Sequence, residues 1–387
     1  MVNETSVQDW ENLVKKQLKT EDINTFLSRE NLEGIEVKPY YGETSHALKN
    51  LPKIEENTHL VAPYHEDYEG EVRAFLLNQN VEGLENKTIF INNKDLAEHI
   101  SPQETDEYFS LIDVFDEENA VLDEQLAREM LAKDFRRNIC IDVSLHQNAG
   151  ASIVQQLAFA LAKTKELTEL FGKEVLNRIL FRVATGGNYF FEIAKLRALK
   201  LVFHEFSKEW DTPLFPYIFS ETTLRNKSKL DEENNLIRST LELSAAMIGG
   251  ADAVFSHDYK LDNRTMLSEE ISFKQQIVLA YESIINVFND AANGSYFVED
   301  ITRQFAEKSW QYFLEIEEKG GYIAMLKSGE IQQEINKRAV AEQNWVEEGK
   351  IKLTGINLYP AREKTKTVEE MYSATTIKPV RLAEMFE

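Results

Sequence analysis

A polar cluster with a histidine at its centre follows an apolar run near the middle of the chain. The stretch reads IDVSLHQNAGA over residues 141–151 and holds His146, Gln147 and Asn148. Because a histidine side chain titrates near neutral pH, His146 could transfer protons as a general acid or base. The cluster is therefore the first candidate for a chemical site.

Polar residues follow three further apolar runs in a similar way. These runs lead into Asn188, into Glu221 and into His257. In barrels of alternating strands and helices, functional side chains lie at the C-terminal ends of the strands. We therefore expect a polar ring at that end of a barrel. The alternative is that these residues only cap helices and satisfy loops.

The apolar runs themselves are short and bounded by polar or glycine-containing turns, which is typical of strands covered on both faces. They occupy residues 59–64, 87–92, 138–144, 178–185, 214–220 and 251–257. Repeated strand–helix units, without a G-x-G-x-x-G turn or a P-loop, favour an α/β fold, a (β/α)8 TIM-type barrel. Residues 65–135 are irregular and give only one clear strand.

Helical patterns separate the later runs, at residues 190–201, 237–248 and 273–284. The pattern predicts which face of each helix is buried. For the second helix the expected apolar face consists of Ile237, Leu241, Ser244, Ala245 and Ile248.

The composition limits the classes of partner. The 387 residues carry a formal net charge of −23, which repels nucleic acid and anionic membrane surfaces. The single cysteine, Cys140, excludes an internal disulfide and is expected to be buried. The chain shows no signal-peptide core, no apolar stretch of the ~20 residues that a membrane helix needs and no metal-binding motif. We therefore expect a cytoplasmic protein that binds neither nucleic acid nor membrane.

The chain divides into three parts. Residues 1–55 predict an N-terminal helical arm and the segment that leads into the barrel, with Trp10, Leu13 and Leu18 in a charged amphipathic run. Residues 56–360 form the expected barrel. Residues 361–387 are charged and polar and are expected to be a linker or tail, with no C-terminal cobalamin-binding domain.

Four long stretches resemble the acyl-CoA mutase family that uses adenosylcobalamin, in the order and spacing of that family. They are IDVSLHQNAGASIVQQLAFALA, ILFRVATGGNYFFEIAKLRALKLVF, NNLIRSTLELSAAMIGGADAVFSHDY and NGSYFVEDITRQFAEKSWQYFLEIEEKGG. The resemblance covers about residues 138–360, and within the family it is greatest to the small, or β, subunits of methylmalonyl-CoA mutase. It implies a barrel through which coenzyme A threads and a cobalamin held by a separate domain.

The resemblance also implies which residues an active chain would need. With the segments aligned on Ala149-Gly150-Ala151, the family's catalytic Tyr-His pair reads Ser144 and Leu145, so His146 is displaced by one residue. The glutamate near cobalamin reads Asn148.

Two further segments bear on the substrate and the cofactor. The family's His-Ser-Gln segment reads Phe219-Ser220-Glu221, while Glu242 matches a family glutamate beside the cofactor. The resemblance therefore implies a degenerate pocket with no catalytic residue and no metal ligand. Its candidate residues are His146, Gln147, Asn148, Asn188, Phe219, Glu221 and Glu242.

The resemblance therefore implies a non-catalytic small subunit that pairs with a large, or α, methylmalonyl-CoA mutase chain. In this interpretation the adenosylcobalamin belongs to the partner, this chain binds no cofactor, and the isolated chain can self-associate. One alternative is a catalytic mutase barrel whose cobalamin domain lies on a separate chain. Another is a stand-alone barrel that binds a small molecule, since fold alone does not assign function. Whether the bore admits coenzyme A stays open.

Overall fold

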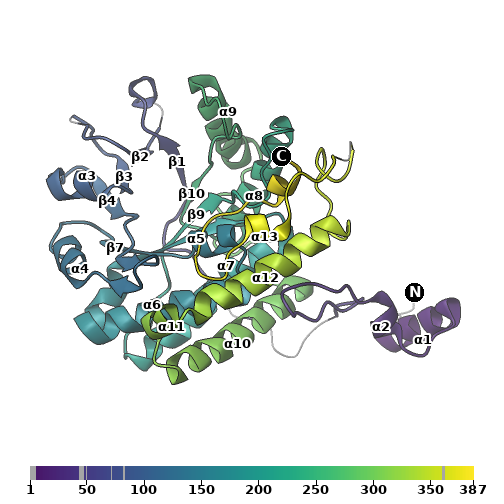
Figure 1. The fold of residues 1–387 in the computed structure, drawn as a ribbon. Helices are drawn as coiled ribbons and strands as arrows, with labels where there is room; N and C mark the ends of the chain where they lie inside the picture. The colour runs from purple at the N-terminus through teal and green to yellow at the C-terminus, as the bar shows by residue number, and fades with distance from the viewer. Residues whose placement is uncertain (1–5, 43–47, 49, 71, 82, 360–361) are drawn as a thin grey trace, which may run out of the picture.

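A computed structural model describes residues 6–42, 48, 50–70, 72–81, 83–359 and 362–387 (Figure 1). Its centre is a parallel sheet whose strands follow one another in chain order. Two isolated parallel bridges, Phe109 with Arg137 and Asp113 with Cys140, bring the two ends of the sheet together. The expected (β/α)8 barrel is thereby confirmed. The barrel strands are β1 (His59–Pro63), β2 (Ala74–Leu77), β3 (Thr88–Ile91), β4 (Glu107–Ser110), β7 (Ile139–Asp142), β8 (Ile179–Thr185), β9 (Ile218–Thr222) and β10 (Ala253–Phe255).

The six strands expected from the sequence overlap β1, β3, β7, β8, β9 and β10, although β9 begins four residues later than expected. Strands β2 and β4 were missed, and both lie in the irregular region of residues 65–135. Their sequences, AFLL and EYFS, contain no β-branched residue, so the pattern that marks the other strands is absent. Connections in this half are short: η1 (Glu66–Tyr68), α3 (Lys94–His99), a hairpin of β5 (Phe115–Asp116) and β6 (Val121–Leu122), and α4 (Glu124–Leu131).

Longer helices surround the second half of the barrel. They are α5 (Ser144–Ala149), α6 (Ile153–Phe171), η2 (Lys173–Asn177), α7 (Tyr189–Glu209), α8 (Glu233–Ile248), and α9 (Met266–Ile277) with the π-helical η3 (Val278–Glu282). The chain then continues through α10 (Tyr296–Glu318), α11 (Tyr322–Ser328) and α12 (Glu330–Glu347). Helix α10 packs across α6 and α7 on the outside of the barrel (Figure 1).

The bore of the barrel is filled with side chains. One buried cluster takes alternate residues from the strands, including Cys140, which is fully buried. The rings of Phe90 and Phe109 lie 5.0 Å apart, those of Phe90 and Phe219 also 5.0 Å, and those of Phe109 and Tyr217 4.8 Å. These aromatic contacts make the bore a packed core rather than a channel.

Helix α8 buries only part of the expected apolar face. Ala245 is fully buried, but Ile237 is 63% and Leu241 52% exposed, while Asn235 and Glu242 on the same helix are fully buried. The prediction was wrong for Ile237 and Leu241 because the buried polar residues have partners: Asn235 donates to the carbonyl of Ser228 at 2.8 Å, for example. Satisfied polar groups are tolerated in a core, so apolar periodicity alone did not determine the orientation.

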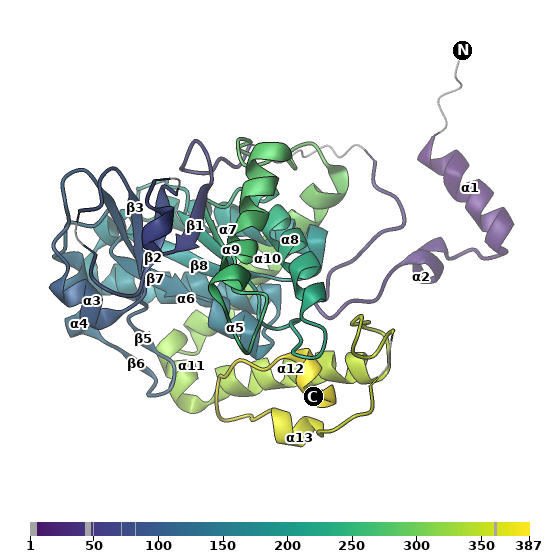
Figure 2. The same ribbon diagram turned by 90° about the horizontal axis from the view of Figure 1, so that it is seen from above.

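The two ends of the chain behave differently. Helices α1 (Val7–Leu18) and α2 (Ile23–Leu27) form the expected arm, which projects from the body (Figure 2). At the other end, α13 (Val368–Met371) and η4 (Leu382–Phe386) lie against α12, and Leu382 and Phe386 are buried. The last residues of the expected tail are thus part of a small core. The boundary expected at residues 360 and 361 lies outside the described residues.

Candidate functional site

His146 lies in the short helix α5, which follows β7. Its side chain is fully buried, and its Nε2 lies 2.7 Å from the hydroxyl of Tyr322. That hydroxyl donates to Glu117 at 2.5 Å. His146 is therefore joined to the β5–β6 hairpin and to α11, away from the bore.

Lys163 of α6 completes this buried group. Its ammonium lies 2.5 Å from Glu117 and 3.0 Å from Asp113. Burial alone would lower the pKa of Lys163, but the two carboxylates outweigh it and raise that pKa. The same ion pair and His146 lower the pKa of Glu117 against the effect of burial. The contacts explain His146 as part of a charged network that fastens the hairpin to the barrel.

A second charged group closes the mouth of the bore, directly above the aromatic core. The guanidinium of Arg182 donates to Glu221 at 2.6 and 2.9 Å, and it lies 3.5 Å from Asp142. Glu221 is 3% exposed, and His257 approaches it at 3.5 Å. Burial opposes ionisation of this carboxyl, yet Arg182 and His257 lower its pKa to about 2. The negative charge of Glu221 is thus balanced by Arg182. Phe219 lies one layer below, in the aromatic core.

A cavity of about 580 Å³ lies beside this mouth, at the ends of β7, β8 and β9; we call it the mouth cavity. Gln147 and Asn188 line it, as the expected polar ring requires. The ammonium of Lys195 donates to the side-chain oxygen of Gln147 at 2.6 Å and forms an ion pair with Glu192. The polar side chains of the inner wall are therefore bonded to one another. The complete wall of the mouth cavity is formed by Glu30–Glu33, Gln147, Ala151, Ile153, Gln156, Gly186–Asn188, Phe191, Glu192, Thr223, Arg225, Asn226, Arg238, Arg338, Glu342, Trp345, Ile351–Leu353 and Leu382.

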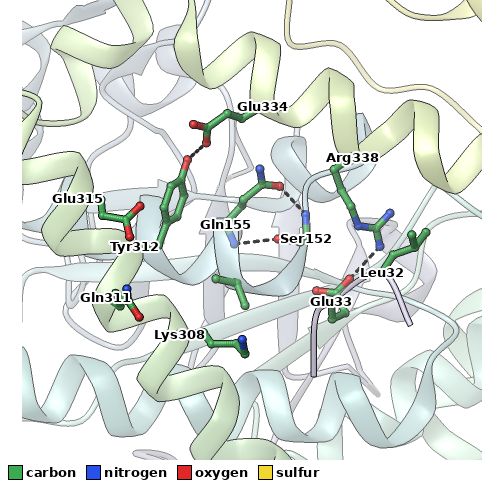
Figure 3. Close-up of a pocket in the computed structure, with 11 residues that line it drawn as sticks. Leu32, Glu33, Ser152, Gln155, Lys308, Gln311, Tyr312, Glu315, Glu334 and Arg338 are labelled. Carbon is green, nitrogen blue, oxygen red and sulfur yellow. Dashed lines mark hydrogen bonds and ion pairs between the residues drawn. The ribbon is translucent and has the colours of Figure 1, made fainter. Parts of the chain in front are cut away.

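A second pocket, of about 370 Å³, shares Leu32, Glu33 and Arg338 with the mouth cavity (Figure 3). Glu33 accepts from Arg338 at 2.9 Å and from the backbone of Ile153 at 2.7 Å. Figure 3 shows this pair at one side of the pocket and the contact of Tyr312 with Glu334 at the other. Glu33 therefore fastens the N-terminal segment to the first turn of α6, where a carboxylate is favoured.

Asn148 and Glu242, the positions that the resemblance places beside cobalamin, both have protein partners. The Asn148 side-chain oxygen accepts from Thr223 at 2.8 Å and from the backbone of Leu224 at 2.9 Å. Glu242 pairs with Lys227 at 2.7 Å and is fully buried. The side-chain oxygen of Asn148 and the carboxylate of Glu242 are therefore both engaged with protein groups.

The residues at the positions of the family's Tyr-His pair, Ser144 and Leu145, also make structural contacts. Ser144 donates from its hydroxyl to Asp142 at 2.7 Å, and Leu145 is half-buried in α5. Gly150 ends α5 with φ +103°, and a Cβ there would lie 2.5 Å from that of Ala339. The close approach of α12 therefore requires the glycine of the AGA step.

The structure brings together only part of the candidate set. Gln147 and Asn188 share the mouth cavity, whereas His146, Phe219, Glu221 and Glu242 lie in other buried groups. Sequence reasoning missed the buried cations that organise these groups: Lys163, Arg182, Lys195, Arg225 and Lys227. A basic residue within an otherwise apolar run, such as Arg182 in ILFRVAT, is the signal that could have identified them.

The described residues contain neither a membrane-spanning helix nor a metal-binding cluster. In the part of the chain that the structure covers, no helix is long and apolar enough to cross a membrane. Within the same residues, no group of three or more His, Cys, Asp or Glu side chains is placed to hold a metal ion.

Comparison with known proteins identifies relatives of the chain. The family model described as methylmalonyl-CoA mutase matches residues 130–385. A methylmalonyl-CoA mutase of Rhizobium meliloti is 31% identical over 245 residues, which is 60% of this chain and 34% of that protein. A methylmalonyl-CoA mutase small subunit of Porphyromonas gingivalis is 29% identical over 226 residues, 55% of this chain and 37% of that protein. A probable small subunit of Mycobacterium bovis is 30% identical over 241 residues, 58% of this chain and 38% of that protein. The matched region spans little more than a third of the length of these relatives.

Proposed function

Since the chain belongs to the methylmalonyl-CoA mutase family, we propose that it acts as a non-catalytic small subunit. In this proposal it stabilises a large catalytic chain, and the complex isomerises methylmalonyl-CoA to succinyl-CoA. Two of the relatives reported above carry the name small subunit, which supports this role over that of an independent enzyme. The proposed site of action is the cytoplasm.

The observation that carries the proposal is the filled bore. In the family that the sequence resembles, the substrate's coenzyme A arm threads the barrel. Here Phe90, Phe109, Tyr217 and Phe219 are fully or almost fully buried in mutual contact along that path. Admitting a linear arm would require the displacement of several packed rings, each of which stabilises the fold by a few kcal/mol.

The charged mouth supports the same proposal. A negatively charged acyl group above the bore would meet Glu221, whose charge is already balanced by Arg182. Replacing that pairing would leave a buried charge without its partner, which is costly. The cofactor is therefore assigned to the large subunit, since Asn148 and Glu242 here are engaged with protein groups.

The test measures binding and turnover on purified chains. We expect calorimetric titration of this chain with coenzyme A or methylmalonyl-CoA to give no binding heat. We also expect visible-absorbance titration with adenosylcobalamin to show no binding. The large chain of the same organism serves as the positive control and should form a stable complex with this chain. Turnover by this chain with a separately supplied cobalamin domain would instead establish the catalytic alternative.

The mouth cavity supports a second candidate function, that of a barrel which binds a small molecule. Its volume of about 580 Å³ lies within the range of ligand pockets, and its wall combines Phe191 and Trp345 with several charged groups. A ligand that stabilises this chain against heat in the absence of any mutase partner would favour this candidate. An Asn188→Leu variant, which changes the cavity wall, should then lose that stabilisation.

A further inference from the structure

One surface of the barrel exposes large apolar side chains next to one another. On α8, Ile237 and Leu241 are 63% and 52% exposed. On the neighbouring α9 and the segment after it, Tyr281 is 72% and Phe288 50% exposed. We call the complete set the charge-poor face: Ile237, Leu241, Val278, Tyr281, Ile284, Val287 and Phe288.

A contact between α8 and α9 brings part of this set together. Thr240 of α8 donates to Gln275 of α9 at 2.7 Å, which places the two helices side by side (Figure 2). Leu241 follows Thr240 directly, and Val278 lies one turn beyond Gln275. Ile237 and Leu241 share one face of α8, and Val278 and Tyr281 share one face of η3, since residues three or four apart share a helix face. Ile284, Val287 and Phe288 follow in the chain directly after η3.

The sequence of this face is unusual for the chain. Charged residues make up 28% of the whole sequence, yet between Lys274 and Asp290 the only one is Glu282. Depletion of charge together with aromatic enrichment is typical of the centre of a protein–protein interface. An ordinary solvated surface of such an acidic chain would carry more charge.

The backbone of the same segment is strained. It begins as the π-helical η3, a form that is frequent at functional sites. Ile284 then adopts φ +55°, and among the described non-glycine residues with positive φ it is the only β-branched one. Such a conformation persists only where neighbouring structure imposes it.

Two anchors beyond Ile284 impose that conformation. The carbonyl of Asn286 accepts from the backbone of Thr58 at 3.3 Å. Asp290 accepts from Arg197 at 2.9 and 3.0 Å in a buried ion pair. The anchors fix the backbone after Ile284, and on it Val287 and Phe288 remain 43% and 50% exposed.

The net charge of the chain favours a different protein over a second copy of this chain as the molecule that covers this face. Two copies would bring together net charges of −23 each, which opposes self-association. A partner with an apolar centre and a basic rim would meet no such repulsion. A stable complex needs about 800 Å² from each partner, and a buried aromatic side chain contributes up to about 150–250 Å². Seven half-exposed residues approach that requirement.

We propose that the charge-poor face is the docking surface for the large mutase chain. This inference rests on the proposed function, because the partner is the one that the small-subunit role requires. It adds the location of the interface, on α8 and the η3 segment, and the chemistry of the complementary surface. The partner must present apolar side chains surrounded by lysine or arginine.

The experiment compares the affinity of variants for the purified large chain of the same organism, by biolayer interferometry. The double variant Leu241→Gln/Tyr281→Ser removes two exposed apolar side chains, and we expect affinity to fall at least about thirtyfold. The matched control is Leu170→Gln on α6, which is 36% exposed and lies outside the face. Its affinity should stay within about twofold of the parent chain.

A further variant separates folding from docking. Ile284→Asn places at φ +55° a residue that tolerates this conformation. We expect the isolated variant to melt at or above the temperature of the parent chain, while its affinity for the large chain falls. A lower melting temperature with unchanged affinity would overturn the role given to the strain.

The remaining outcomes distinguish the two proposals. If the parent chain binds the large chain and the double variant binds equally well, the docking surface is wrong while the proposed function stands. If the parent chain does not bind the large chain, both fail. If the double variant loses only self-association, the face belongs to a second copy of this chain and the proposal is overturned.

Discussion

Two layers of the barrel interior lie next to each other along the same strands and are stabilised in opposite ways. On β9, Phe219 belongs to the aromatic layer, and two residues later Glu221 belongs to the charged layer at the mouth. The aromatic layer depends on contact area, so losing one ring leaves the others in place. The charged layer depends on complete pairing, so losing one cation leaves acids buried without a partner. The second layer is therefore less tolerant of single changes than the first.

The largest expected effect is in the charged layer. Arg182→Met leaves Glu221 and Asp142 without their shared cation, and we expect a loss of about 5 kcal/mol in the free energy of unfolding. Urea denaturation measures it. The double variant Arg182→Met/Glu221→Leu should recover part of the loss, since it removes a buried charge together with its partner. A double variant less stable than the single one would contradict the comparison.

A smaller loss is expected in the aromatic layer. Phe219→Ala removes one ring from contact with Phe90 and leaves a cavity, which costs about 3–4 kcal/mol. Denaturant unfolding of this variant, measured beside Arg182→Met, tests the ranking directly. An aromatic substitution that costs more than the arginine substitution would reverse the relation between the two layers.

Acid should distinguish the layers as well. The pKa of Glu221 is lowered to about 2 in the folded chain, below its ordinary value of 4.5. Its contribution to stability is therefore present above pH 4.5 and is lost as the pH falls toward 2, by about 3 kcal/mol in all. Unfolding measured from pH 6 to pH 3 should show a flatter decline for Arg182→Met/Glu221→Leu than for the parent chain. Equal slopes would show that Glu221 is not the titrating group.

The smallest effect is expected for His146. His146→Gln retains a hydrogen-bonding side chain beside Tyr322, and we expect mutase activity of a complex with the large chain to stay within about threefold. Loss of a true general acid or base costs ~10²–10⁴-fold. Steady-state assay of the assembled complex decides between these outcomes, with size-exclusion chromatography as the control for assembly.

Sequence reasoning predicted the barrel because six strands carry β-branched apolar runs of the kind that parallel sheets need. It missed β2 and β4, where phenylalanine, tyrosine and leucine fill the same buried positions without that signature. It also placed Ile237 and Leu241 of α8 on the buried face, where Glu242 and Asn235 are paired inside the protein instead. Burial of paired polar groups depends on residues far away in sequence.

The candidate site was predictable in part for the same reason. The strand ends do carry polar residues, and Gln147 and Asn188 do line a cavity there. His146 and Glu221 looked available because their partners, Tyr322 and Arg182, belong to other elements. Only the tertiary contacts reveal that both side chains are already engaged.

Cys140 has a consequence for measuring how the barrel opens. It is the only thiol in the chain, it is fully buried in the aromatic layer, and burial raises its pKa. A thiol reagent can reach it only when the strands separate, so the labelling rate reports the frequency of that event. Proteins open locally with free energies that range up to that of global unfolding. Labelling in increasing urea would show whether one half of the barrel opens locally or the barrel opens only by global unfolding. An equilibrium melting curve does not distinguish these two kinds of opening.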